Sequence, residues 1–135
     1  MTFPPAVPEI PVAELGSALA YYRDCLGFVV DWGDDGLGLA GLSQGESRVF
    51  MSSAAYRATN GHADSGPVVV WLNLSSRAEV DGLHARWSAA GATIDAPPEA
   101  KPWKLHEFSA RDLDGNVLRV FYDFGSEERE AASKT

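Results

Sequence analysis

The stretch DLDGNVLRVFYDF, from Asp112 to Phe124, indicates the fold most directly. DLDGN is rich in residues that favour tight turns, and the residues after it have the composition of a strand. Strand alternation puts Val117, Arg119 and Phe121 on one face and leaves an apolar and aromatic set on the other. The second face suits packing against helices. We therefore predict that Arg119 lines a concave face of a sheet.

Two similar runs of elements are predicted along the chain, each consisting of a strand, a helix and three strands. In the first run the strands are residues 5–13, 28–32, 37–43 and 47–53, and the helix lies within residues 14–28, closed by Gly27. In the second run the strands are residues 67–74, 92–97, 104–111 and 117–124. Its helix is opened by a capping box from Ser76 to Glu79 and closed by Gly91. The repeated order predicts a tandem duplication.

Two segments have no hydrophobic period. Residues 54–66, AAYRATNGHADSG, are predicted to be a mobile polar loop. Residues 125–135, GSEEREAASKT, are predicted to be a disordered charged tail. We therefore expect one domain over residues 1–124, with modules at about 6–53 and 67–124.

The composition limits the possible partners. The chain has 135 residues, of which 45% are hydrophobic and 22% charged, as is typical of one globular domain. A net charge of −8 disfavours nucleic acid and indicates either solubility alone or, more specifically, a cationic ligand. No apolar run approaches the roughly 20 residues of a membrane span, and the N-terminus lacks the features of a secretory signal. The single cysteine, Cys25, predicts a reducing, cytoplasmic location.

Two motifs carry a resemblance to a known superfamily. SALAYYRDCLGF resembles the first-helix signature of the vicinal oxygen chelate (glyoxalase, bleomycin resistance and dioxygenase) superfamily, and FSARDLDGNVLRVF resembles its closing signature. Within that group the chain is most similar to bleomycin-resistance proteins, including the Pro102–Trp103 pair, over roughly residues 5–124. The resemblance implies an α+β fold in which two tandem βαβββ modules form a curved mixed sheet around a groove.

The resemblance also indicates where a metal-binding member of the superfamily would have its ligands. Metalloenzymes of this superfamily take ligands from four strand positions, which fall here on Val7, Phe50, Val69 and Arg119. Three of these residues are apolar and one is cationic, so none offers the lone pairs that a divalent metal needs. A register shift of two residues brings Glu9 inward, but no second ligand with it. We predict neither a metal nor another cofactor, and no catalytic residue.

Without a metal, the groove is expected to bind by stacking, shape and charge. Bleomycin-resistance proteins hold a cationic, flat-ringed glycopeptide between aromatic side chains in an acidic groove, and the resemblance implies the same function here. Indoles stack on a flat ring, carboxylates attract a cation, and Arg119 either pairs with an acid such as Glu9 or meets a carbonyl or anionic group of the ligand. The predicted ligand-binding residues are Trp32, Trp103, Trp71, Phe50, Asp31, Asp35, Ser52, Arg119 and Glu107.

The proline-rich N-terminus bears on assembly. Pro4, Pro5, Pro8 and Pro11 keep this arm extended. By resemblance, the arm crosses to a second subunit and gives a homodimer. Two other functions remain open: a glyoxalase-like isomerase or lyase or a ring-cleaving dioxygenase, which needs a metal or a general base in the groove, and an accessory subunit that binds nothing.

Overall fold

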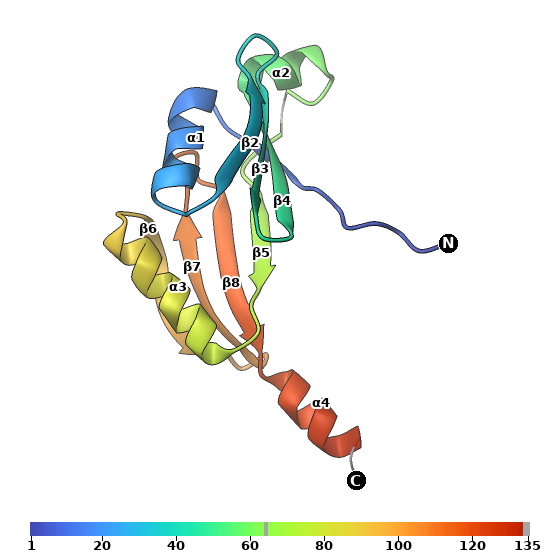
Figure 1. The fold of residues 1–135 in the computed structure, drawn as a ribbon, viewed down its shortest axis with the longest axis vertical. Helices are drawn as coiled ribbons and strands as arrows, with labels where there is room; N and C mark the ends of the chain where they lie inside the picture. The colour runs from blue at the N-terminus through green and yellow to red at the C-terminus, as the bar shows by residue number, and fades with distance from the viewer. Residues whose placement is uncertain (64, 134–135) are drawn as a thin grey trace. The chain divides into compact units, whose positions relative to one another are not determined.

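The computed structural model describes residues 1–63 and 65–133, which form two compact units (Figure 1). The first unit is Met1–Val68 together with Asp112–Asn116, and the second is Val69–Arg111 together with the chain from Val117 onward. The first unit contains β1 (Glu9–Pro11), α1 (Leu15–Asp24), β2 (Val29–Asp34), β3 (Leu39–Gln44), β4 (Ser47–Ser52) and α2 (Ala54–Thr59). The second contains β5 (Val69–Asn73), α3 (Arg77–Ala89), β6 (Thr93–Ala100), β7 (Leu105–Arg111), β8 (Val117–Asp123) and α4 (Gly125–Ser133).

Each unit has a four-stranded mixed sheet, and the order of strands is the same in both. The order is β1-β4-β3-β2 in the first unit and β5-β8-β7-β6 in the second. β1 runs parallel to β4, and β5 runs parallel to β8, whereas the remaining neighbours are antiparallel. The prediction of an α+β fold with two tandem βαβββ modules is confirmed. No helix in the described residues has both the length and the apolar character needed to cross a membrane.

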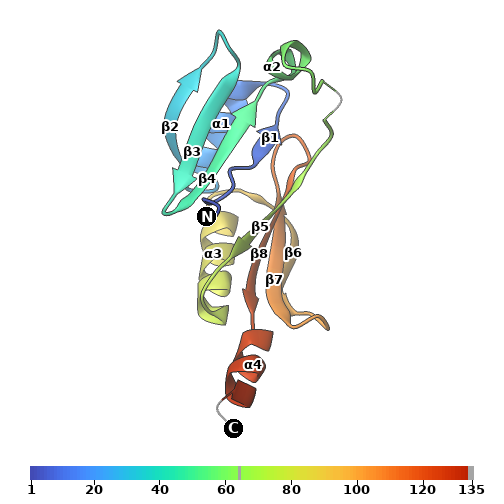
Figure 2. The same cartoon turned by 90° about the vertical axis from the view of Figure 1, so that its right-hand side faces the viewer.

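In the first unit, α1 covers one face of the sheet (Figure 2). The helix buries Leu15, Ala18 and Tyr22. Its N-terminus is capped by the Glu14 carboxylate, which accepts hydrogen bonds from the first free backbone N–H groups. The predicted closure at Gly27 is corrected: the C-cap is Cys25, and Gly27, with a φ of 78°, turns the chain two residues later.

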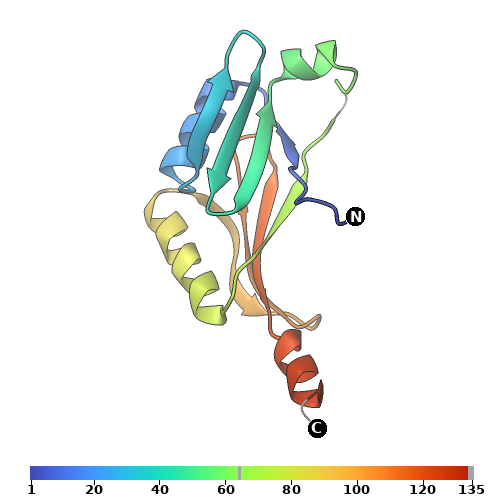
Figure 3. The same ribbon diagram turned by 45° about the vertical axis from the view of Figure 1, so that its right-hand side comes forward.

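In the second unit, α3 covers one face of the sheet (Figure 3). Ser76 caps this helix through a hydrogen bond of 3.1 Å from the Glu79 N–H, as the capping box predicted. Trp87 is buried against Phe108, with ring centroids 5.5 Å apart. Leu118 and Val120 of β8 are buried as well, which confirms the predicted apolar face of that strand.

The DLDGN turn forms a buried hydrogen-bond network within the first unit. Asp112 Oδ1 accepts from the backbone N–H groups of Asp114 and Asn116, at 2.8 and 2.9 Å. Asp112 Oδ2 accepts from the Tyr22 hydroxyl at 2.7 Å. The Asn116 amide donates to the Pro11 carbonyl at 2.8 Å. Burial, and next the charge of Asp112, raise the pKa of Tyr22 well above its usual value, so the hydroxyl stays protonated and donates.

The prediction of an irregular loop over residues 54–66 was wrong for the first residues of that segment. Residues 54–59 form α2, whose N-terminus is capped by Ser53 through a 3.2 Å bond from the Tyr56 N–H. The helix buries Arg57, whose Nη1 donates to the carbonyls of Val12, at 3.1 Å, and Ser52. A hydrophobic period cannot reveal a helix whose buried residue is an arginine. Residue 64 of the predicted loop lies outside the described residues.

The predicted disordered tail is also corrected, because residues 125–133 form α4. Glu127 and Glu128 lie in its first turn, where negative charge favours a helix. Glu127 accepts from Arg77 and from the Tyr122 hydroxyl, each at 2.9 Å.

Two strand boundaries also differ from the prediction. The N-terminal strand is shorter than predicted, and β6 continues to Ala100 because its prolines lie on an edge strand.

Candidate functional site

The exposed face of the second unit is organised around Arg119. The strand register places Trp71 on one side of Arg119 and Ser109 on the other. The guanidinium carbon lies 4.2 Å from the centroid of a Trp71 ring, a close cation–π contact. Arg119 also donates to Glu107 Oε2, from Nε at 2.9 Å and from Nη2 at 2.7 Å. Arg119 is therefore a cation fixed on two sides.

Glu107 links this arginine to a second indole. Its side chain is only 2% exposed, and its other oxygen, Oε1, accepts from Trp103 Nε1 at 2.6 Å. Trp103 itself is 54% exposed. Burial of a carboxylate is tolerated when each oxygen has a donor and a cation lies beside it, and both conditions are met here. The structure thus joins Trp71, Trp103, Glu107 and Arg119, all of them predicted ligand-binding residues, in one network.

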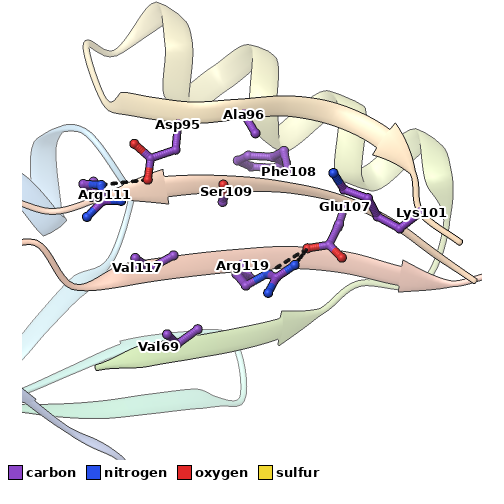
Figure 4. Close-up of a pocket in the computed structure, with 10 residues that line it drawn as sticks. All are labelled: Val69, Asp95, Ala96, Lys101, Glu107, Phe108, Ser109, Arg111, Val117 and Arg119. Carbon is purple, nitrogen blue, oxygen red and sulfur yellow. Dashed lines mark hydrogen bonds and ion pairs between the residues drawn. The ribbon is translucent and has the colours of Figure 1, made fainter. Parts of the chain in front are cut away.

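A pocket of about 550 Å³ lies on the same face of the second unit (Figure 4). Two ion pairs border it: Arg119 with Glu107, and Arg111 with Asp95, the latter with Nε and Oδ2 2.8 Å apart. Its lining residues come from β5, β6, β7, β8 and the β6–β7 connection: Val69, Asp95, Ala96, Lys101, Glu107, Phe108, Ser109, Arg111, Val117 and Arg119.

The exposed face of the first unit carries a different set of side chains. The register aligns Glu9, Phe50, Gly41 and Trp32 in one row across β1, β4, β3 and β2. The rings of Trp32 and Phe50 lie 5.6 Å apart at 64°. The indole lies across Gly41, where a Cβ atom would be 2.4 Å from Trp32 Nε1. Glycine at this position therefore provides the space that the indole occupies.

Glu9 forms a cluster that the sequence did not reveal. Its Oε2 accepts from the Ser52 hydroxyl at 2.9 Å and lies 2.7 Å from His62 Nε2. His62 Nδ1 lies 3.1 Å from the Asn60 carbonyl, so both ring nitrogens face acceptors. The bond to Glu9, and next that to Asn60, raise the pKa of His62 above its usual value. The contact between Glu9 and His62 was not predicted, because His62 was placed in the loop after β4.

Asp31 and Asp35, the remaining predicted site residues, are exposed in β2 and the turn that follows it. Their neighbour Asp34 has a structural role, because its carboxylate accepts from the Leu37 N–H at 2.9 Å and closes the turn. Proximity in sequence did not distinguish the acid that closes the turn from the two for which residues 1–63 and 65–133 show no side-chain hydrogen bond or ion pair.

Comparison with known families identifies the chain. The model of the glyoxalase/bleomycin resistance protein/dioxygenase superfamily matches residues 5–120. The chain belongs to this superfamily. Comparison with curated proteins returned no match.

Several solved structures of superfamily proteins are similar to the chain. A glyoxalase/bleomycin resistance protein/dioxygenase from Nocardioides is 22% identical with a TM-score of 0.74, covering 90% of this chain and 85% of its own. A bleomycin-binding protein from Streptomyces verticillus, complexed with copper(II)-bleomycin, is 26% identical with a TM-score of 0.68, covering 89% and 96%. A lactoylglutathione lyase from Agrobacterium tumefaciens is 23% identical with a TM-score of 0.70, covering 88% and 94%.

The metal of the superfamily's metalloenzymes does not fit the residues present here. The four positions expected from the resemblance hold Val7, Phe50, Val69 and Arg119, and a guanidinium repels a cation. The strand register puts Glu9 beside Phe50 and Trp71 beside Arg119, which adds one carboxylate to this set. The described residues include no group of three or more histidine, cysteine or acidic side chains arranged to hold a metal ion. Glu9 and His62 form a pair only. The donor set of these residues therefore does not match the ligand set of the superfamily's metalloenzymes.

Proposed function

We propose that the chain binds and sequesters a small aromatic, cationic molecule without a metal, and that a bleomycin-type antibiotic is the leading candidate. One observation carries this proposal. Three indoles are exposed although each is already held by a neighbour: Trp32 is 40% exposed, Trp71 46% and Trp103 54%. Exposed aromatic side chains that are fixed in place are ready to stack on a flat ring, Trp71 and Trp103 in the second unit and Trp32, taken by itself, in the first.

The other predicted residues have complementary roles in this proposal. Phe50 supports the Trp32 ring, whereas Ser52, predicted to contact the ligand, is fully buried and acts through the hydrogen bond that holds Glu9 in place. Asp31 and Asp35 attract the ligand's positive charge, as does the net charge of −8. The similarity to a bleomycin-binding protein supports this choice of ligand. Cys25, a free cysteine, agrees with action in the cytoplasm.

The proposal includes a homodimer with exchanged N-terminal arms. β1 pairs with β4 of the same chain, and the residues before it form no helix or strand. Met1 and Phe3 are exposed hydrophobic side chains on this segment. An apolar, proline-stiffened arm of this kind is suited to packing on a second subunit. Sedimentation of the full chain and of a chain lacking residues 1–7 tests this part.

A titration with bleomycin tests the proposed function. Metal-free and copper-bound bleomycin are added at low and at moderate salt, and binding is followed by calorimetry and by tryptophan fluorescence. We expect saturation at one ligand per chain, weaker binding at higher salt, and no effect of a chelator on the metal-free titration. Absence of heat and of quenching with both forms would refute the bleomycin assignment.

A second function is kept because of one observation. The hydrogen-bonded Glu9–His62 pair is an acid and a base in contact, which an enzyme of this superfamily could use for proton transfer. Elemental analysis of protein purified without chelator or nickel resin separates the two functions. A stoichiometric metal would favour a glyoxalase-like or dioxygenase-like enzyme, and its absence together with bleomycin binding would favour sequestration.

A further inference from the structure

The charges around the pocket of the second unit run against the charge of the whole chain. The chain carries a net charge of −8, yet the pocket is lined by three cationic side chains, Lys101, Arg111 and Arg119, and two anionic ones, Asp95 and Glu107. A ligand that enters this pocket therefore meets an environment different from the acidic surface that attracts it.

The two acids of the pocket are already engaged. Both oxygens of Glu107 accept from side chains, one from Trp103 and the other from Arg119, and burial removes this carboxylate from solvent. Asp95 accepts from Arg111 across β6 and β7. Glu107, with both oxygens occupied, is a poor partner for a cationic group of a ligand. Asp95 is 29% exposed and is engaged through Oδ2, where the positive charge of Arg111 offsets its own.

Hydrogen-bond donors remain available in the same pocket. Arg119 is 31% exposed and uses Nε and Nη2 on Glu107, and for its Nη1 no acceptor is recorded in the described part of the chain. Lys101 is 22% exposed, and its Nζ lies 3.4 Å from the exposed Glu99 carboxylate and 5.8 Å from the centroid of the Trp103 ring. Such exposed pairs are weak, so the ammonium can exchange its partner. Ser109 lies on β7 between the two ion pairs (Figure 4).

We propose that this pocket binds a planar oxyanion, in the simplest case a carboxylate, that the aromatic ligand carries beside its ring. The free edge of Arg119 donates to the oxyanion, with Lys101 and the Ser109 hydroxyl as further donors. A guanidinium matches the geometry of a carboxylate better than any other cationic side chain does. The inference rests on the proposed function, because the indoles of Trp71 and Trp103 hold the ring, and it specifies the ligand as an aromatic zwitterion, which carries an oxyanion in addition to its cationic group.

Arg119 is held ready for this role before the ligand arrives. Stacking on Trp71 and the two bonds to Glu107 restrict its long side chain. Binding then immobilises few additional rotamers, which lowers the entropic cost of association. By the resemblance, the superfamily's metalloenzymes have a metal ligand at this position. This chain has Arg119 there, which is itself a cation.

Three probes that share one ring system test the proposal. Naphthoate, naphthalenemethanol and naphthylmethylammonium differ only in having a negative, neutral or positive group, and calorimetry on the full chain at low salt gives their dissociation constants. We expect naphthoate to bind about tenfold more tightly than the alcohol, because a charge-assisted bond to a fixed arginine adds to stacking. Higher salt should reduce this advantage.

Substitutions locate the source of the preference. Arg119→Gln should abolish the advantage of naphthoate, and Lys101→Gln should reduce it. Because Arg119→Gln leaves Glu107 buried without its cation, the double variant Glu107→Gln/Arg119→Gln removes both charges and guards against misfolding. Arg86→Gln is the matched control, since Arg86 is an exposed arginine of α3 that does not line the pocket.

The outcomes separate this inference from the proposed function. Equal affinity for naphthoate and the alcohol, a preference for the ammonium probe, or an advantage that survives in the double variant would each overturn the oxyanion site while leaving ring stacking intact. If no naphthalene probe binds, ring stacking is refuted. The oxyanion site is then tested by itself, by titrating acetate and following the NMR resonance of the Arg119 Nε–H group. A saturable shift, absent with chloride and absent in Lys101→Gln/Ser109→Ala, supports the site, and no shift overturns it.

Discussion

Arg119 Nη2 lies 2.7 Å from Glu107 Oε2, although these residues are not direct cross-strand partners. The register of β7 and β8 pairs Arg119 with Ser109 and Glu107 with Phe121, so the ion pair runs diagonally across the sheet. Diagonal neighbours in a sheet are within reach of long side chains. The cation predicted to line the concave face is therefore paired, and the same geometry leaves one edge of the guanidinium facing the pocket.

Removing this cation should destabilise the fold. Breaking a buried pair on one side costs about 3–5 kcal/mol, and because Arg119 is partly exposed we expect about 2 kcal/mol for Arg119→Gln in urea unfolding. The double variant Glu107→Gln/Arg119→Gln should lose less, since no buried charge is left alone. Arg86→Gln should change the free energy of unfolding by less than about 0.5 kcal/mol. A double variant less stable than Arg119→Gln would contradict the pairing argument.

Trp103 should matter for binding more than for folding. Trp103→Ala is expected to weaken the binding of bleomycin by about 2 kcal/mol or more, as for an aromatic anchor. Trp103→Phe keeps a ring but removes the N–H that Glu107 accepts, so it should retain part of the affinity. Calorimetry gives the affinity, and circular dichroism verifies that the variants fold. Unchanged affinity in Trp103→Ala would remove this residue from the site.

Asp112 should be a major determinant of stability in the first unit. Asp112→Ala leaves the Tyr22 hydroxyl and two backbone N–H groups of the turn without their acceptor, and we expect a loss of about 3 kcal/mol. Tyr22→Phe removes only one of these bonds and should cost about 1 kcal/mol. Urea unfolding of both variants measures the difference. Equal losses would mean that the carboxylate contributes only through the tyrosine.

His62 should make the stability of the first unit depend on pH. Its pKa is raised in the folded state by the bond to Glu9, so its contribution is fully present below the unfolded pKa of about 6.5 and is lost as the pH rises through the folded value. The difference in unfolding free energy between the wild type and His62→Gln should shrink over that window. Glu9→Gln should lower the pKa measured for His62 by NMR. A difference that is constant with pH would argue against an imidazolium at this position.

Local patterns in the sequence predicted the elements better than the contacts between them. The Ser76 cap and the buried face of β8 follow from short-range rules, and both are present. Arg119 was predicted either to pair with an acid such as Glu9 or to meet a carbonyl or anionic group of the ligand, and the structure pairs it with a different acid, Glu107. That pairing depends on the register and the twist between two strands, which hydrophobic alternation along one strand does not determine.

The missed elements have a common physical cause. α2 buries an arginine through hydrogen bonds to carbonyls, and α4 is held by ion pairs and the charges of its first turn. Neither helix presents an apolar stripe, which is the signal that periodicity detects. The His62–Glu9 contact joins a connecting segment to β1 across 53 positions of the sequence, and no local pattern encodes it.

The row formed by Trp32 and Gly41 also constrains how this surface can evolve. A methyl group at position 41 would collide with the indole, so Gly41→Ala forces the ring to leave the sheet and Phe50 to lose its edge contact. Positions 32 and 41 should therefore change together among descendants of this chain. A lineage that replaces the tryptophan can accept a side chain at position 41, whereas one that keeps the tryptophan must keep the glycine.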